Sequence, residues 1–419
     1  MESASENADT DSPPPRASVG GDPPSDRLAV AEQLDDSTPM TVAEICNKIL
    51  GVIYGGVIGD IVGQGEEFTD LSFNAEQLLV TAASFSATDG FRLPVFMERL
   101  KGLVAVKGGD KYTADVVAHE DFVKDPGQES LRVFKTYNNY DVEDAGIHDR
   151  GLVEATEGGA PLIRAVFLGV FADWDNYAVG ACLATHYDAR VIAASYIAAS
   201  FTRSMMLGRP TVIREIMESA VYTITTLERI TNKFVVREMM RVLVPAVMLD
   251  PARHHEISGA DDSALKCLSA GVWALSTITG DPPTYAAAEV GGRISEALAA
   301  IQSRGGSAIQ NCGLAGAMMG GEAGYKGLPL GVLGRLPPAA AANVRGVAVS
   351  FLRAIKLLGG DEAIEEALSD RPPLSAEPTP AGAADVPALA GGERLVDVDE
   401  PVKRADPVPL EPVDGGVED

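Results

Sequence analysis

The sequence holds few cysteines and few basic residues, and each shortage excludes a class of protein. Its 419 residues include 4 cysteines, which lie far apart and form neither a disulfide framework nor a Cys-x-x-Cys metal pair. Lysine and arginine number 34 against 60 aspartates and glutamates, for a net charge of −26. Because phosphate binding needs clustered basic side chains, this balance argues against a nucleic-acid-binding surface. The isolated cysteines fit a reduced, intracellular protein.

Long uninterrupted apolar runs are also missing. The stretches near 45–63 and 191–207 are broken by Lys48 and Asp60, and by Arg203. Neither offers the clean run of about 20 apolar residues that a membrane span needs. The first residues, Met-Glu-Ser-Ala-Ser-Glu, are acidic and lack the apolar core of a signal peptide. The sequence therefore predicts a soluble cytoplasmic or nuclear protein without a membrane partner.

Composition divides the chain into a central domain and two polar ends. Residues 1–38 are rich in Ser, Pro, Asp and Gly, and residues 369–419 are rich in Pro, Ala and acids. Neither end has enough large apolar groups to bury, so we expect both to be disordered. Residues 39–368 are expected to form one domain, since a chain with 46% hydrophobic residues can build a sizeable core.

The central domain is predicted to be all-α, an orthogonal multi-helix bundle, because no long segment alternates apolar and polar residues. A capping-box pattern, Thr41 with Glu44, predicts the start of the first helix. Gly55, Gly59 and Gly63 share one face of that helix, and each costs up to about 1 kcal/mol relative to alanine. Either close packing of another helix or a ligand is expected to offset this cost. Further helices are expected at about 76–106 with a turn at Asp89-Gly90, and at 191–207, 212–250, 266–277, 295–302 and 340–358.

A second glycine-rich segment begins at Gly305 and runs through small residues to Gly321, followed shortly by Gly-Leu-Pro. A double-glycine turn before such a run predicts a loop that leads into a closely packed helix. The segment resembles the C-terminal signature of the ADP-ribosylglycohydrolase family, Gly-Gly-Asp-x-Asp-Thr-Asn followed by Ala/Gly repeats. In that family the aspartates and the threonine help to hold two magnesium ions. The corresponding residues here are Ser307, Ile309 and Gln310.

The first glycine-rich helix resembles the N-terminal signature of the same family, Gly-x-x-x-Gly-Asp-x-x-Gly-x-Pro-x-Glu. The chain matches it from Gly55 to Glu67, except that Gly65 replaces the proline. The resemblance implies that Glu67 is a glutamate close to metal and substrate, and therefore the candidate catalytic residue. Taken without the resemblance, Glu67 would be interpreted as an exposed side chain at a helix end.

A third signature of the family, Thr/Ser-Asp-Asp-Thr, corresponds to Ser72, Phe73, Asn74 and Ala75. Magnesium prefers octahedral coordination by oxygen. Ser72 and Asn74 supply neutral oxygens, whereas Phe73 and Ala75 supply none. The resemblance therefore implies Mg²⁺ as the family's cofactor, and the substitutions predict that Mg²⁺ binds this chain weakly or not at all.

Two further segments resemble the side of the family's pocket that binds ADP-ribose. The stretch from Gly158 to Arg164 resembles Ser-Asn-Gly-x-x-Met-Arg, with Gly158-Gly159 in place of Ser-Asn. Thr-His-Tyr-Asp-Ala-Arg, which contains His186 and Asp188, matches the family's Thr-His-x-Asp-x-Arg at a helix start. Arg164 is either a ligand contact or a structural ion-pair partner, and a lone histidine is often structural. The implied substrate-binding residues are Gly59, Asp60, Arg164, His186, Gly306, Ser307 and Asn311.

These signatures lead to one hypothesis and two alternatives. The leading hypothesis is a catalytically impaired ADP-ribosylglycohydrolase-like protein that still binds ADP-ribose or an ADP-ribosylated partner. One alternative is an active Mg²⁺-dependent hydrolase whose missing ligands come from residues 107–155, for example Asp110, Asp141, Glu143 or Asp144. The other is a structural or scaffolding protein that reuses the fold, since fold does not imply function.

Overall fold

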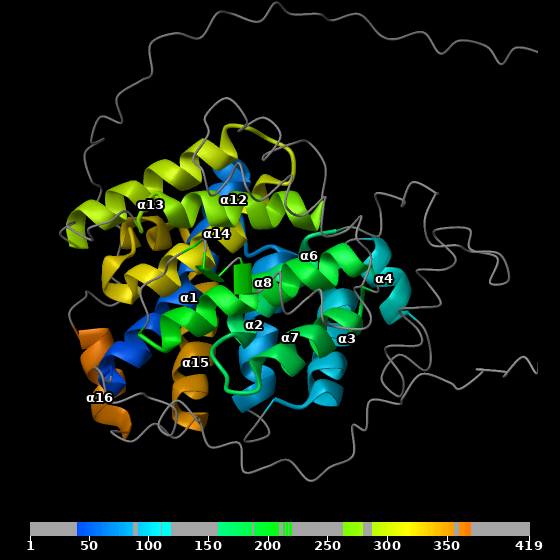
Figure 1. Cartoon of the computed structure of the whole chain (residues 1–419), viewed down its shortest axis with the longest axis horizontal. Helices are drawn as coiled ribbons and strands as arrows, with labels where there is room; N and C mark the ends of the chain where they lie inside the picture. Colours follow the sequence, from blue (N-terminus) through cyan, green and yellow to red (C-terminus); the bar gives the residue numbers. More distant parts are fainter. Residues whose placement is uncertain are drawn as a thin grey trace, which may run out of the picture. The chain divides into compact units, whose positions relative to one another are not determined.

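A computed structural model of the chain describes residues 40–86, 91–109, 111–118, 158–186, 188–208, 263–279, 287–355 and 360–369, with a few residues between 213 and 219. Within these segments the regular elements are all helices, which confirms the predicted all-α class (Figure 1). They are α1 (Val42–Gln64), η1 (Gly65–Glu67), α2 (Phe73–Ser86), α3 (Leu93–Lys107), α4 (Lys111–Val117), α6 (Ala160–Leu168), α7 (Trp174–Leu183), α8 (Ala189–Met206), α12 (Ala264–Ser276), α13 (Ala287–Gln302), α14 (Ala308–Ala323), η5 (Tyr325–Gly327), η6 (Leu330–Arg335), α15 (Pro338–Ala354) and α16 (Gly360–Ser369).

Helix α1 begins at the predicted capping box. The Thr41 hydroxyl accepts a hydrogen bond from the Glu44 amide at 3.2 Å, and the Glu44 carboxylate accepts one from the Thr41 amide at 2.7 Å. The reciprocal pair satisfies backbone donors that the first turn of a helix leaves open. This confirms the predicted start of the helix.

Helices α1 and α14 form the centre of the fold and pack in antiparallel directions (Figure 1, blue and yellow). The glycine face of α1 lies directly against the backbone of α14. A Cβ added at Gly59 would come within 2.9 Å of Gly313 Cα, and one at Gly63 within 2.7 Å of Ile309 Cα. Of the two explanations for these glycines, close helix packing is therefore observed. Because the helices are antiparallel, the end of α1 meets the beginning of α14.

The apolar character of α1 is explained by its place in the core. Among the described residues, it is the one helix long and apolar enough to cross a membrane by length and composition. However, 83% of its most apolar 18-residue window is buried inside the protein. Its single lysine, Lys48, donates to the backbone oxygen of Glu322 at 3.2 Å, near the end of α14.

A cluster of aromatic rings joins α2, α6 and α15 on one side of the central pair. The rings of Phe85 and Phe171 stack with centroids 4.4 Å apart, and those of Phe167 and Phe351 meet edge-on at 4.8 Å. Ring pairs at such distances add to the stabilisation from buried apolar area. The cluster fixes α2 and α6, which carry parts of the site described below.

Several predicted helix boundaries differ from the observed ones by a few residues. Helix α2 begins at Phe73 rather than near residue 76, and α8 begins at Ala189, where the Asp188 carboxylate caps it by accepting from the Arg190 amide at 2.8 Å. Apolar periodicity locates the body of a helix, and its ends are set by caps and local hydrogen bonds that periodicity does not detect. The predicted turn at Asp89-Gly90 and most of the predicted helix 212–250 lie outside the described residues.

Candidate functional site

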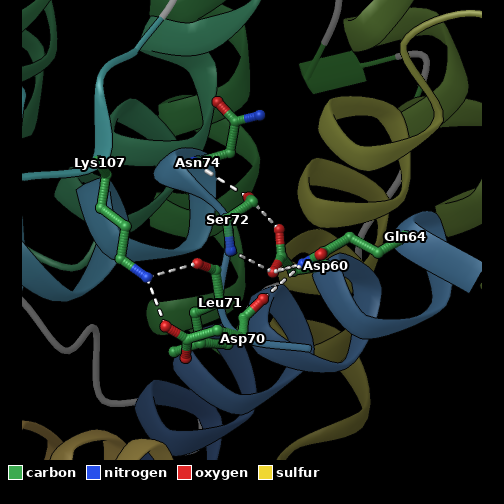
Figure 2. Close-up of polar contacts among 7 residues, drawn as sticks. All are labelled: Asp60, Gln64, Asp70, Leu71, Ser72, Asn74 and Lys107. Atoms are coloured by element: carbon green, nitrogen blue, oxygen red, sulfur yellow. Dashed lines mark hydrogen bonds and ion pairs between the residues drawn. The ribbon is translucent and has the colours of Figure 1, made fainter. Parts of the chain in front are cut away.

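Asp60, near the end of α1, lies at the centre of a polar cluster (Figure 2). The side chain is 1% exposed. Its Oδ2 accepts hydrogen bonds from the Ser72 amide at 2.9 Å and from Gln64 Nε2 at 2.8 Å, and its Oδ1 accepts one from the Ser72 hydroxyl. Both carboxylate oxygens are therefore engaged by donors of the protein itself.

Two opposing effects act on the protonation of Asp60. Burial raises the pKa of its carboxyl above the usual range, because a low-dielectric surrounding disfavours the charged form. The hydrogen bonds from Ser72 and Gln64 act in the opposite direction but do not cancel the effect of burial. A raised pKa favours the neutral acid, which is a poorer ligand for a cation than a carboxylate.

The beginning of α2 is organised around Ser72. Its hydroxyl oxygen accepts from the Asn74 amide at 3.1 Å, and its backbone oxygen accepts from the Glu76 amide at 3.0 Å. The ring of Phe73 packs against the end of α3, since a Cβ added at Gly109 would come within 3.0 Å of it. Ser72 and Phe73 stand at positions where the family signature has metal ligands, and here both side chains contact other parts of the protein.

Lys107, the last residue of α3, closes the connection that precedes α2 (Figure 2). Its ammonium group donates to the Asp70 carboxylate at 2.6 Å and to the Leu71 backbone oxygen at 3.1 Å. The ion pair lowers the pKa of Asp70, mainly through this hydrogen bond. The positive charge of Lys107 also opposes the burial effect on Asp60 and on the half-buried Glu76.

The beginning of α14 forms the next part of the site. Gly305 and Gly306 both have positive φ, at 70° and 65°, and lead into Ser307 at the N-cap, whose side chain makes no capping hydrogen bond. Asn311 is buried at 2% exposure. Burial raises the pKa of the Cys312 thiol to about 12, with a smaller contribution from Asp60. The thiol is therefore protonated and unreactive at neutral pH.

A second polar cluster surrounds Arg164 of α6, which is completely buried. Its Nη1 donates to Gln77 Oε1 of α2 at 2.6 Å, and its Nη2 donates to the hydroxyl of Thr185. The same hydroxyl lies 2.9 Å from His186 Nδ1. The guanidinium carbon also lies 5.6 Å from the centre of the Phe96 ring. Arg164 thus connects α2 with the segment that follows α7.

The Gly158-Gly159 turn joins the two clusters. A Cβ added at Gly158 would lie 3.5 Å from His186 Nε2. A Cβ added at Gly159 would lie 3.2 Å from Gln310 Oε1, in the first turn of α14, and 3.3 Å from Cys267 Sγ. The turn therefore lies between His186 on one side and the beginning of α14 on the other.

Most of the residues predicted for the site belong to this continuous set of contacts, although their roles stay predictions. The set runs from α1 and the beginning of α2, through the beginning of α14, to the Gly158-Gly159 turn and the cluster around Arg164. Its predicted members are Gly59, Asp60, Ser72, Phe73, Asn74, Gly306, Ser307, Ile309, Gln310, Asn311, Arg164 and His186.

Glu67, the candidate catalytic residue, lies apart from these contacts. It is exposed in the η1 turn. The turn is held from outside by Arg335, which donates to the Gly65 backbone oxygen and lies 5.5 Å from the Phe68 ring centre. Gly65 has a φ of 64°. Proline is restricted to φ near −65°, so the proline of the family signature could not adopt this turn.

The sequence did not single out Gln64, Gln77 and Lys107 as parts of the site, and it pointed to Thr185 only as the first residue of the Thr-His-x-Asp-x-Arg motif. Gln77 had a signal, because it is a polar residue on a helix whose neighbouring residues Ala75, Leu78 and Leu79 are buried. Lys107 showed no such signal in the sequence, because its partner Asp70 lies 37 residues away along the chain.

The described residues do not fit a two-magnesium centre. Two divalent cations need several anionic oxygens, and Phe73, Ile309 and Gln310 supply none. The Asp60 carboxylate already accepts three hydrogen bonds from protein donors. In the part of the chain that the structure describes, no group of three His, Cys, Asp or Glu side chains is placed to hold a metal ion. The substitute ligands considered above, Asp110, Asp141, Glu143 and Asp144, lie outside that part.

Comparison with known proteins tests the resemblance. The family model for ADP-ribosylglycohydrolases matches residues 41–360. One solved structure, described as "ADP-ribosylglycohydrolase-related protein complex", is similar with 18% sequence identity and a TM-score of 0.47, and the match covers 74% of this chain and 99% of that chain. No curated protein matches the chain.

Proposed function

Because this chain belongs to the ADP-ribosylglycohydrolase family, we propose that it is a member that keeps a pocket for ADP-ribose and has lost two-metal hydrolysis. Its ligand is ADP-ribose itself or the ADP-ribose group of a modified protein. Family membership supports ADP-ribose as the class of ligand. The substitutions at the family's metal-ligand positions support the loss of hydrolytic activity.

The observation that carries the proposal is the state of Asp60. In a hydrolytic metal site, carboxylates must be ionised and directed at the cation. Asp60 instead directs both of its oxygens at protein donors, the Ser72 amide and hydroxyl and the Gln64 side chain. The positions around it that carry acids in the family signatures hold Phe73, Asn74 and Ser307 here.

Retention of the pocket is supported by the residues on its other side. Arg164, Thr185 and His186 are completely buried and linked to one another by hydrogen bonds. Beside them, the half-buried Gly158 carries no side chain, which suits close approach by a ligand, whereas Gly159 is buried against Cys267 and Gln310. These hydrogen bonds compensate the cost of burying the polar groups and hold them in place beside the turn.

The proposal is tested by assaying hydrolysis and binding on the same preparation of the full chain. Incubation with an ADP-ribosylated protein and Mg²⁺ is expected to release no ADP-ribose. Free ADP-ribose at about 100 times its Kd is expected to stabilise the fold by about 2.7 kcal/mol, measured as a rise in Tm. Steady Mg²⁺-dependent release would instead identify an active hydrolase. If no ADP-ribose is released and the Tm does not rise, the result would favour a scaffolding role.

A further inference from the structure

The ammonium group of Lys107 is held by two oxygen atoms of the connection that leads into α2 (Figure 2). It donates to the Asp70 carboxylate at 2.6 Å and to the Leu71 backbone oxygen at 3.1 Å. A carboxylate and a backbone carbonyl are also oxygen ligands that divalent cations take from proteins. The charged nitrogen of Lys107 therefore occupies a position suited to a positive ion.

The same connection, residues 70–72, is fixed on its other side by α1. Gln64 Nε2 donates to Asp60 Oδ2 at 2.8 Å and to the Asp70 backbone oxygen at 3.0 Å. The amide and the hydroxyl of Ser72 both donate to the Asp60 carboxylate. Residues 70–72 therefore lie between the end of α1 and the end of α3, and Lys107 makes the polar contacts on the α3 side.

The end of α3 presents this charge in a fixed position. Lys107 is the last residue of the helix, where the partial negative charge of the helix dipole favours a cation. The amide of Gly108, which has a φ of 85°, closes the helix by donating to the Val104 oxygen at 2.9 Å. Gly109 follows and packs against the ring of Phe73. A polar and an apolar contact thus join the end of α3 to the beginning of α2.

Three acidic side chains depend on the charge of Lys107. Burial raises the pKa of Asp60 and of Glu76, and the charge of Lys107 lowers both values. The charges of Asp70 and Asp60 raise the pKa of Glu76 further. With no cation beside them, these groups would repel one another on ionisation. An isolated surface ion pair contributes little to stability, but Lys107 acts on three acids and a backbone carbonyl.

We propose that Lys107 is a resident cation, which holds residues 70–72 and the beginning of α2 against α1 in the way that a bound metal ion would. Lys107 is a positioning residue, since it acts on Ser72 and Asp60 through the Asp70-Leu71 backbone. The proposal explains how this part of the site keeps its arrangement although the described residues do not fit a two-magnesium centre. It involves no ligand and is therefore independent of the proposed binding of ADP-ribose.

Substitutions in the full chain test the role of the charge. Lys107→Met keeps most of the side-chain length and removes the charge. We expect its Tm to fall by about 2–4 °C, as for the loss of one modest interaction. Amide hydrogen exchange in residues 72–76, measured by mass spectrometry, is expected to be about tenfold faster, because a hydrogen bond from a charged group is lost.

Two control variants accompany this substitution. Lys107→Arg keeps the charge and is expected to stay close to the wild type in Tm and exchange. Lys101→Met removes an exposed lysine of the same helix and is expected to change neither quantity. A Tm and an exchange rate of Lys107→Met equal to those of the wild type would contradict the proposal.

Magnesium distinguishes a cation from an ordinary packing contact. Millimolar Mg²⁺ is expected to raise the Tm of Lys107→Met and to slow its exchange in residues 72–76, because the Asp70 and Leu71 oxygens are then open to a metal ion. The wild type and Lys107→Arg are expected not to respond. Sodium chloride at equal ionic strength controls for screening of charge. Failure of Lys107→Met to respond, or an equal response of the wild type, would overturn the proposal.

A second uncharged variant covers the case in which Lys107→Met does not fold, which circular dichroism would reveal. Lys107→Gln can still donate hydrogen bonds but carries no charge. It is expected to show the same fall in Tm and the same response to Mg²⁺, since the proposal assigns the role to the charge. Stability and exchange equal to the wild type in Lys107→Gln would show that hydrogen bonds alone suffice, and the proposal would be wrong.

Discussion

At the scale of single residues, Asp60 shows how a carboxyl group is accommodated in the core. It is buried at 1% exposure, and both of its oxygens accept hydrogen bonds. The hydrogen bonds compensate part of the cost of burying a carboxylate. The remaining cost appears as the raised pKa.

The raised pKa makes a prediction about stability and pH. A carboxyl whose folded pKa lies above its unfolded value of about 3.8 contributes most stability below that value. The contribution is lost as the pH rises through the folded pKa, since the fold must then bury the charge. The stability of the wild type relative to Asp60→Asn should therefore fall as the pH rises above about 4.

Urea denaturation of both proteins across this range measures the difference. Glu76 also has a raised pKa, but it is present in both proteins and cancels to first approximation. A relative stability of the wild type that increases with pH would mean that the hydrogen bonds from Ser72 and Gln64 outweigh burial.

At the scale of elements, the contact between α1 and α14 positions the site. The glycines of α1 let the two backbones approach until Gly59 meets the Cys312-Gly313 peptide and Gly63 meets Ile309. Consequently Asp60, between these two glycines, lies beside the beginning of α14. The glycines that weaken α1 as an isolated helix are those that bring the halves of the site together.

Adding one methyl group at this crossing should therefore be costly. In Gly59→Ala the Cβ would come within 2.9 Å of Gly313 Cα and overlap the Cys312 carbonyl, so backbone must move. We expect a loss of about 3 kcal/mol in the free energy of unfolding, as for overpacking of a rigid core. Urea denaturation measures the loss as a lower midpoint.

The matched control is Gly292→Ala on α13, where an added Cβ meets no atom within 4 Å. Alanine there should stabilise the helix by up to about 1 kcal/mol because it restricts the unfolded chain and favours helix. Equal effects of the two substitutions would mean that α1 and α14 are not in backbone contact.

At the scale of the whole molecule, local signals predicted the fold and only part of the site. The Thr41 and Glu44 pattern predicted the beginning of α1, and the glycine spacing predicted a close helix contact, because both depend on neighbours within a few turns. The bond between Arg164 and Gln77 joins residues 87 positions apart. No periodicity encodes such a pairing, so whether Arg164 binds ligand or supports structure could not be decided from sequence.

The family signatures predicted site residues that the spacing of residues along the sequence alone could not identify. They identified segments around Asp60, Arg164, His186 and Ser307 that the fold places in continuous contact. They did not predict that Gly65 would adopt a φ of 64° and that Glu67 would be exposed. The roles of these residues and the domain bounds at 38 and 369 stay predictions.

The central claim is that this family member binds ADP-ribose without a metal. The most direct test is calorimetric titration of ADP-ribose into the full chain, first with Mg²⁺ and then with EDTA. We predict that the two Kd values agree within about twofold, because the residues proposed to bind ligand, His186 and the Gly158-Gly159 turn, need no cation. Binding that is abolished by EDTA would contradict the account and would require metal ligands elsewhere in the chain.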